Sequence, residues 1–200
     1  MNTLAHFLNK VFKRFRVILC LDTRTTLALR KKCKLEGWGA VYVYPKNKIR
    51  VAKKASIHVI NGELVFSKPW FEVNDIGPCA FEMENGSKLK CFGDFDFIRG
   101  SKCIVKEGAI LHLGSGGRIG KGSELRCNGE INIGAHCWIS DNVTISDAGK
   151  IVIEDGVWIG NGAKIEGNLR IGENVVIGEG VHVTTDIEDE KVITNQYCRF

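Results

Sequence analysis

The chain has 200 residues and a formal net charge of +5, and 44% of its residues are hydrophobic, which suits one folded domain rather than a disordered chain. The charge is uneven. Residues 1–54 hold 14 Lys or Arg against 2 Asp or Glu, whereas residues 55–200 hold 14 against 21. The eight cysteines show neither a CxxC pair nor zinc-ligand spacing, which argues against a structural metal. Met1–Phe15 is basic and lacks the apolar core of a secretory leader, so we expect reduced thiols and a cytoplasmic protein.

The N-terminal region has the pattern of an amphipathic helix. Its apolar residues recur every three or four positions, and they are Leu4, Phe7, Leu8, Val11, Phe12, Phe15, Ile18 and Leu19. Two interpretations stay open: the helix packs on the protein or on a neighbouring subunit, or it makes a peripheral contact with an anionic membrane. The longest apolar run, Val17–Leu21, is too short to cross a bilayer. No nucleic-acid recognition motif accompanies the charge, so we expect no nucleic-acid partner.

The next part of the chain mixes a short helix with irregular strands. A helix is expected over Thr25–Lys32. From about Ile49 to Leu125, short strand-like segments are separated by turn-forming pairs such as Asn-Gly, which indicates wide or irregular first coils of a solenoid. Phe92, Phe95 and Phe97 are expected to plug the open end of its core.

A six-residue repeat dominates the C-terminal half. Aliphatic residues return at every sixth position, and a second apolar residue lies two positions before each. The first set is Ile153, Ile159, Ile165, Ile171, Ile177 and Val183, and the second is Ile151, Val157, Ala163, Leu169, Val175 and Val181. Two inward residues separated by one outward residue form a short strand, and the other positions turn the chain. The pattern is typical of an all-β fold, a parallel β-helix of hexapeptide repeats. We therefore expect a basic helical region at 1–45, irregular first coils at 46–112, the regular repeat at 113–187 and a tail at 188–200.

Two slips of two residues interrupt the period, the first at Ile131 and the second after Ile145. If three hexapeptides make one coil, each coil has 18 residues, or 20 where an insertion falls. This spacing predicts three outward columns: Arg118, Trp138, Trp158 and Val176; Thr144, Lys164 and His182; and Asn132, Val152 and Arg170. It also stacks Asn142 on Gly162 and Gly180 at one corner of the coil. Two stacked outward tryptophans indicate a subunit interface or, as the alternative, a ligand wall.

Three segments resemble the hexapeptide-repeat acyltransferases, most of all those that O-acetylate sugars and surface polysaccharides. They are IGAHCWISDNVTISD (133–147), VWIGNGAKI (157–165) and IGEGVHVTTDI (177–187). The resemblance covers about residues 85–187. It implies a left-handed triangular β-helix, a homotrimer, and acetyl-CoA held in clefts between subunits. In similar enzymes a catalytic histidine lies in a long loop after the NVTI-x-D segment. In this chain SDAGK passes almost directly into the next strand, and no histidine occurs between residues 137 and 181.

The candidate site residues follow from these positions. His136 is the expected general base for acyl transfer to a hydroxyl, because it lies at a corner in the coil that carries Asn142; His182 and His112 are the substitutes. Asn142 and Asp147 match the segment that leads to the family's histidine. Candidate cofactor contacts are Trp158, Gly160, Ala163, Gly178 and Thr184, with the backbone N–H groups of Gly160, Ala163 and Gly178 as donors. No metal site is expected, since the histidines show no paired spacing.

Three functions remain open. The first is acetyl-CoA-dependent O-acetylation of a sugar or a surface-polysaccharide intermediate. The second is a catalytically inactive family member that acts as a scaffold or partner, because the usual histidine loop is missing. The third is a transferase with another donor, or a metal enzyme of the carbonic-anhydrase type on the same fold.

Overall fold

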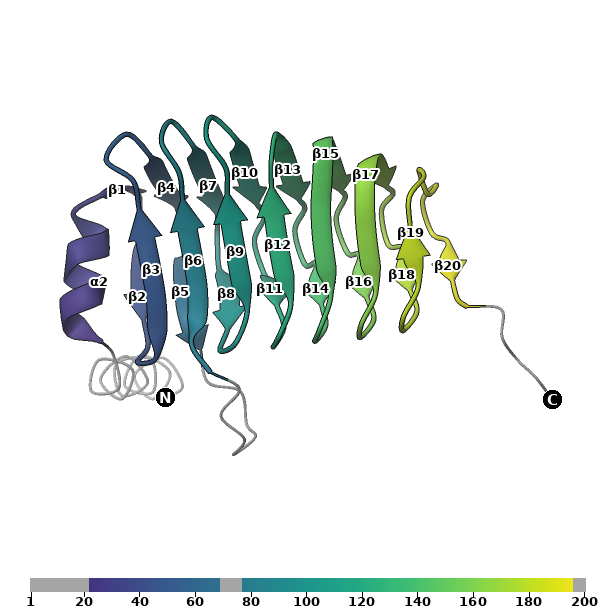
Figure 1. Cartoon of the computed structure of the whole chain (residues 1–200), viewed down its shortest axis with the longest axis horizontal. Coiled ribbons are helices and arrows are strands. Elements are labelled where there is room, and N and C mark those ends of the chain that lie inside the picture. The colour runs from purple at the N-terminus through teal and green to yellow at the C-terminus, as the bar shows by residue number, and fades with distance from the viewer. Residues whose placement is uncertain (1–21, 69–76, 196–200) are drawn as a thin grey trace, which may run out of the picture.

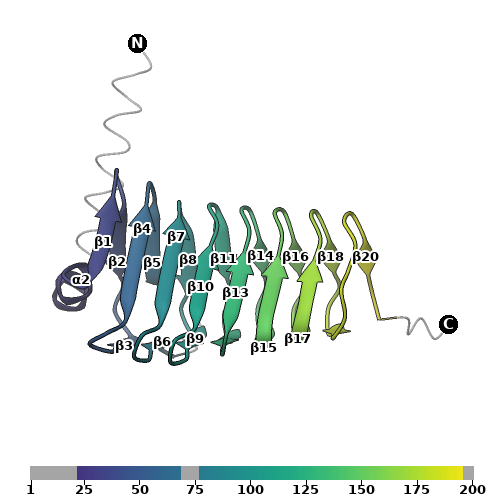
Figure 2. The same cartoon turned by 90° about the horizontal axis from the view of Figure 1, so that it is seen from above.

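The computed structural model describes residues 22–68 and 77–195, which form a parallel β-solenoid with a helix at its N-terminal end (Figures 1 and 2). Successive coils stack along one axis, and each coil contributes strands to three faces. The helix expected over Leu4–Leu19 lies outside the described residues. The expected left-handed sense of the coil stays a prediction.

The strands of each face pair in parallel with the strands one coil away. The first face holds β1 (Cys33–Glu36), β4 (Ser56–Ile60), β7 (Lys88–Phe92), β10 (Ile110–Leu113) and β13 (Glu130–Ile133). The second face is an eight-stranded sheet of β2 (Ala40–Val43), β5 (Glu63–Lys68), β8 (Phe95–Ile98), β11 (Gly117–Ile119), β14 (Trp138–Ile139), β16 (Trp158–Ile159), β18 (Val176–Ile177) and β20 (Val192–Ile193). The third face holds β3 (Asn47–Val51), β6 (Cys79–Met83), β9 (Lys102–Val105), β12 (Glu124–Cys127) and β19 (His182–Val183). Two long strands, β15 (Thr144–Ile153) and β17 (Lys164–Ile171), continue from the third face into the first.

The register confirms the columns expected from the six-residue repeat. Arg118 pairs with Trp138, Trp138 with Trp158, and Trp158 with Val176. The columns Thr144, Lys164, His182 and Asn132, Val152, Arg170 are also paired as expected. The coils shorten along the chain, from 22 residues between Lys88 and Ile110 to 20 between Ile110 and Glu130 and 18 between Ile151 and Leu169.

The solenoid interior is a ladder of side chains from all three faces. The regular coils fill it with aliphatic residues, because the inward positions of the repeat are Ile, Val, Leu and Ala. The earlier, wider coils need larger side chains, and a cluster of phenylalanines occupies them: Phe66 lies 4.7 Å from Phe81 and 5.1 Å from Phe97, between ring centroids. The prediction for Phe92 is wrong, because this ring is 46% exposed and packs edge-on against His112 outside the coil.

Cysteines take several of the inward positions. Among the described residues, Cys79, Cys91, Cys103, Cys127 and Cys137 are buried and free. Burial raises the pKa of the Cys91 and Cys127 thiols to about 12, so both stay protonated at neutral pH. They therefore pack as neutral side chains.

Helix α2 (Thr23–Arg30) covers the N-terminal end of the core. Asp22 caps it, since its carboxylate accepts a hydrogen bond from Thr25 N at 3.0 Å. Leu29 is buried in the core, and Thr26 bonds through its hydroxyl to the backbone of Val43. The plug of the end is therefore the helix rather than the expected phenylalanines. The strands of the solenoid begin at Cys33, ahead of the boundary expected at residue 46.

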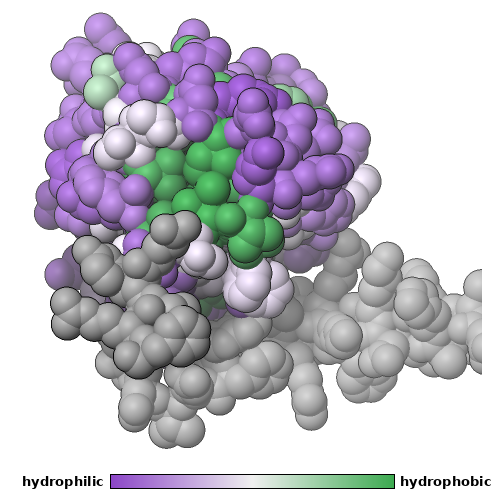
Figure 3. Space-filling model, turned by 90° about the vertical axis from the view of Figure 1, so that its right-hand side faces the viewer, coloured by the Kyte–Doolittle hydropathy of each residue, from purple (hydrophilic) through white to green (hydrophobic). Residues whose placement is uncertain are grey.

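The C-terminal end has no such cover among the described residues. Apolar side chains of the last coils show at the centre of this end, ringed by polar ones (Figure 3). A hollow there is floored by Val183, Ile187 and Ile193. No helix in the described part of the chain is long and apolar enough to cross a membrane.

Candidate functional site

Three stacks of turn residues form the corners of the coil, and the first contains Asn142. Gly122, Asn142, Gly162 and Gly180 have φ values of 66°, 57°, 66° and 66°, the left-handed region that glycine and asparagine adopt most easily. Gly162 N donates to Asp141 O at 2.9 Å, and Gly180 N donates to Asn161 O at 2.9 Å. The expected stacking is confirmed. We call this column the Asn142 corner.

His136 lies at a different corner. Its column, the His136 corner, contains Gly116, His136, Gly156 and Asn174, all with positive φ. The imidazole lies over Gly116, since a Cβ added there would be 2.6 Å from His136 Nδ1, and the side chain is exposed. Five residues, which include β14, lie between His136 and Asn142. Within one chain the two residues therefore belong to opposite edges of the second face.

Asp147 lies at the third corner and is 3% exposed. Its carboxylate accepts hydrogen bonds from Asn128 N at 2.6 Å, Gly129 N at 2.7 Å and Gly149 N at 3.2 Å. These bonds tie two neighbouring coils together, because residues 128–129 and 147–149 belong to successive coils. Every contact of this carboxylate is thus a backbone amide of the corner.

The long loop of similar enzymes has no counterpart after Asp147. Strand β15 runs through this point, and the register with β17 shifts between Asp147 and Ile151. The two extra residues of the second slip are therefore absorbed as a bulge within a strand. The expected absence of the loop is confirmed.

The outer side of the second face carries an apolar stripe. Trp138 is 45% exposed and Trp158 is 51% exposed, and Val192 continues the column at 67%. The Arg118 guanidinium lies 3.1 Å from the centroid of the Trp138 ring, a cation–π contact. Trp158 Nε1 donates to Ser140 Oγ at 3.2 Å, which holds the indole beside the Asn142 corner.

The backbone donors expected for a cofactor are already engaged. Gly160 N donates to Ile177 O and Gly178 N to Ile193 O, each at 2.7 Å. Ala163 N donates to Gly160 O at 3.3 Å, and the Ala163 side chain is fully buried. The N–H groups of Gly160 and Gly178 are thus engaged by the next coil and that of Ala163 by its own turn, and cofactor contact at these residues stays a prediction.

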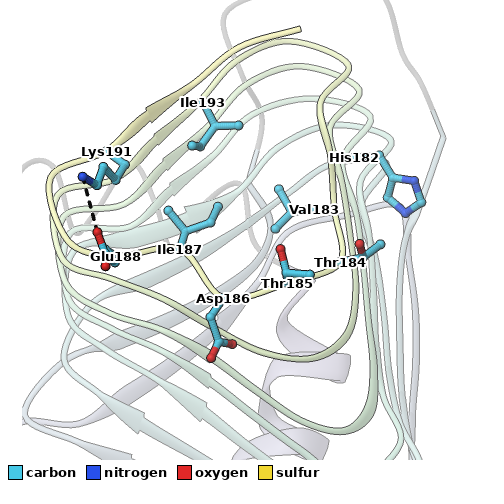
Figure 4. Close-up of a pocket in the computed structure, with 9 residues that line it drawn as sticks. All are labelled: His182, Val183, Thr184, Thr185, Asp186, Ile187, Glu188, Lys191 and Ile193. Atoms are coloured by element: carbon cyan, nitrogen blue, oxygen red, sulfur yellow. Dashed lines mark ion pairs between the residues drawn. The ribbon is translucent and has the colours of Figure 1, made fainter.

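The third face brings three polar side chains together next to the Asn142 corner. Glu166 Oε2 lies 3.0 Å from His182 Nε2 and 2.9 Å from Lys164 Nζ. The hydrogen bond from Lys164, with that from His182, lowers the pKa of the Glu166 carboxyl below its ordinary value. His182 and Thr184 also line the hollow at the C-terminal end, where the His182 ring points outward (Figure 4).

His112 lies on the first face, away from these groups. Burial above all, with Lys90 beside it, lowers the pKa of the imidazole. In residues 22–68 and 77–195, no three His, Cys, Asp or Glu side chains gather closely enough to hold a metal ion. His112 is therefore not part of the cluster of Glu166, Lys164 and His182.

Residues 150–185 match the family model described as bacterial transferase hexapeptide (six repeats). This segment is similar to the six-residue repeat of that family. It holds Trp158, the last turns of the Asn142 corner and the cluster of His182. No curated protein matches the sequence significantly.

Two solved structures are similar to this chain. The polySia-specific acetyltransferase NeuO is 18% identical, with 82% of this chain and 76% of NeuO covered and a TM-score of 0.44. A variant of AntD, an N-acyltransferase from Bacillus cereus in complex with dTDP and coenzyme A, is 15% identical, with 82% of each chain covered and a TM-score of 0.47.

The sequence favoured His136 over His182 because His136 lies at a corner in the coil that carries Asn142, and it did not single out Glu166. The signal was present in the column spacing. Lys164 pairs with His182, so Glu166, two residues further along the same strand, projects from the same face beside them. The geometry thus adds Glu166 and Lys164 to the candidate residues.

Proposed function

We propose that the protein transfers an acyl group, most simply acetyl, from coenzyme A to a hydroxyl of a sugar or glycan. The observation that carries the proposal is the transferase hexapeptide repeat at residues 150–185. The exposed indole of Trp158 beside the Asn142 corner supports it, because a flat aromatic surface suits contact with a sugar or the cofactor.

The proposed reaction needs a base and a donor for the oxyanion. The base takes the proton of the acceptor hydroxyl while its oxygen bonds to the thioester carbonyl carbon. The tetrahedral oxyanion then collapses, the carbon–sulfur bond breaks, and the protonated base returns its proton to the departing thiolate. Histidine suits both steps because its pKa lies close to neutrality.

Two histidines are candidates for this base. His136 is the expected one, and its exposed corner position suits a cleft between subunits. His182 is favoured by its partner, because the carboxylate of Glu166 orients the ring and stabilises the imidazolium that forms during transfer. Asn142 and Thr184 are proposed as contacts to substrate, and Trp158 to the cofactor.

Single substitutions separate these assignments. Whichever of His136→Ala and His182→Ala removes the base is expected to lower kcat/KM about 10² to 10⁴-fold, because general base catalysis contributes this much. Release of CoA from acetyl-CoA in the presence of candidate sugars measures the effect. His112→Ala is the control on another face, and Glu166→Gln should follow His182→Ala with a smaller loss. If both His136→Ala and His182→Ala keep full turnover, both assignments are wrong.

We also propose a homotrimer that buries the apolar stripe of the second face. The double variant Trp138→Glu/Trp158→Glu is expected to be monomeric, because it puts two carboxylates into a desolvated interface. Light scattering coupled to gel filtration measures the mass. Phe92→Glu is the matched control, since this residue is equally exposed but lies on the first face. A wild-type protein that is already monomeric contradicts the proposal.

A second candidate is a non-catalytic family member that serves as a scaffold. The strand β15 in place of the histidine loop favours it, as does the engagement of the backbone donors of Gly160 and Gly178. Calorimetry with acetyl-CoA decides between the two. The absence of binding at millimolar acetyl-CoA rules out the transferase and leaves the scaffold.

A further inference from the structure

The N-terminal end of the solenoid is strongly basic. Residues 22–54, which form α2 and the first coil, hold ten Lys or Arg and two Asp or Glu, a net charge of +8. Seven of these cations are exposed and make no salt bridge within the described residues: Arg24, Arg30, Lys31, Lys48, Arg50, Lys53 and Lys54. The cations at this end are therefore available to a partner.

The basic groups come from α2, from β3 and from the turn that follows β3. Arg24, Arg30 and Lys31 belong to α2 and its C-cap, and α2 lies against β1 and β2 across the end of the core. Lys53 and Lys54 lie in the turn between β3 and β4. We call this surface, formed by α2 and the turns of the first coil, the basic end.

Large apolar side chains stand among these charges. Leu27, on the outer side of α2, is 58% exposed, and Trp38, in the turn between β1 and β2, is 57% exposed. Both are more exposed than Trp138 and Trp158 of the second face. Lysine and arginine together with exposed leucine and tryptophan are the composition that binds to the headgroup region of anionic membranes.

The opposite end of the solenoid has the opposite charge. Residues 141–195 hold eleven Asp or Glu and four Lys or Arg, a net charge of −7. An anionic surface therefore attracts one end of the rod and not the other. The two ends lie at opposite extremes of the long axis (Figure 1).

We infer that the basic end docks on an anionic lipid surface, with α2 and Trp38 at the headgroups and the solenoid axis pointing away from the membrane. The chain that enters α2 agrees with this occupant, because Lys10, Lys13, Arg14 and Arg16 precede Asp22 in the sequence. Exposed Leu27 and Trp38 among the cations favour a lipid surface over a soluble polyanion, because a polyanion gains nothing from apolar anchors. The inference is independent of the transfer chemistry.

Co-sedimentation of the full chain with vesicles tests the docking. The wild type is expected to bind vesicles that contain phosphatidylglycerol and not vesicles of phosphatidylcholine alone, at about 0.1 M salt. Each cation near the surface contributes about fivefold to binding, so Arg30→Gln/Lys31→Gln should weaken it about 25-fold. Lys88→Gln/Lys90→Gln is the control, because it removes the same charge from exposed positions on β7, away from the end.

Fluorescence tests the orientation in the same samples. Brominated lipids are expected to quench tryptophan emission of the wild type, and Trp38→Phe should abolish most of that quenching while Trp158→Phe leaves it. Equal binding to both kinds of vesicle, or an equal loss in the two double variants, overturns the inference. Binding to heparin without binding to vesicles assigns the basic end to a soluble polyanion and also overturns it. A molecular mass that rises with protein concentration in the wild type but not in Arg30→Gln/Lys31→Gln also overturns the inference. That result assigns the basic end to contact with a second copy of the chain.

Discussion

Gly62→Ala is expected to destabilise the fold by about 4 kcal/mol or more, or to prevent folding, because overpacking against fixed backbone is among the costliest single changes. A Cβ at this position would lie 1.9 Å from the carbonyl carbon of Gly93 and 2.2 Å from its Cα. Both atoms are backbone of the next coil. That coil is held by its own parallel pairing, so it cannot move aside without loss of hydrogen bonds between β5 and β8.

The matched control is Gly108→Ala. This glycine has a φ of +71° but no atom within 4 Å of an added Cβ, so only the strain of a left-handed residue remains, about 1 to 2 kcal/mol. Urea denaturation followed by circular dichroism gives both free energies of unfolding. Losses of equal size in the two variants would mean that close stacking of the coils at Gly62 does not limit stability.

The regular half of the fold was predictable because a six-residue period leaves little freedom. Once three hexapeptides make a coil and the two slips are located, the partner of each residue follows by addition. Trp138 therefore had to pair with Trp158, and Lys164 with His182, as the structure has them. The inward set is apolar at nearly every position, Ser123 being an exception, so a register error would have exposed it.

The early coils were not predictable at this level. Their length varies, and no period distinguishes an inward phenylalanine from an outward one. Phe95 and Phe97 alternate correctly as core residues, but Phe92 ends β7 on the outer side. The sequence also did not predict that α2 covers the open end of the core, because the position of that end is known only once the first coil is placed.

The sequence predicted which candidate residues lie at the corners of the coil, but it did not predict which side chains contact each other. His136 and Asn142 are six residues apart, which is the width of one face, so the repeat itself separates them. The engagement of Gly160 N and Gly178 N follows from solenoid pairing and required the register of the last coils. Glu166 and His182 belong to two successive coils, so no local sequence motif predicts their contact.

Asp147→Ala is expected to lose about 3 to 5 kcal/mol of folding free energy, and this loss separates a structural aspartate from a catalytic one. The substitution leaves the N–H groups of Asn128, Gly129 and Gly149 without their acceptor, which is itself buried in a part-buried cluster of hydrogen bonds. An unsatisfied buried donor costs about 1 to 3 kcal/mol, and bonds to a carboxylate lie at the upper end of that range. Denaturant titration of the purified variant measures the loss.

Asp155→Ala is the control for the loss of folding free energy in Asp147→Ala. Asp155 accepts a bond from Ala135 N at 2.7 Å in the preceding coil, but it is exposed, so water replaces the lost acceptor and the cost should be about 1 kcal/mol. A catalytic Asp147 would behave in the opposite way: the variant would fold with near wild-type stability and lose CoA release. A stable but inactive Asp147→Ala therefore returns this residue to the chemistry, whereas an unstable one leaves the base and its partners to be sought among His136, His182 and Glu166.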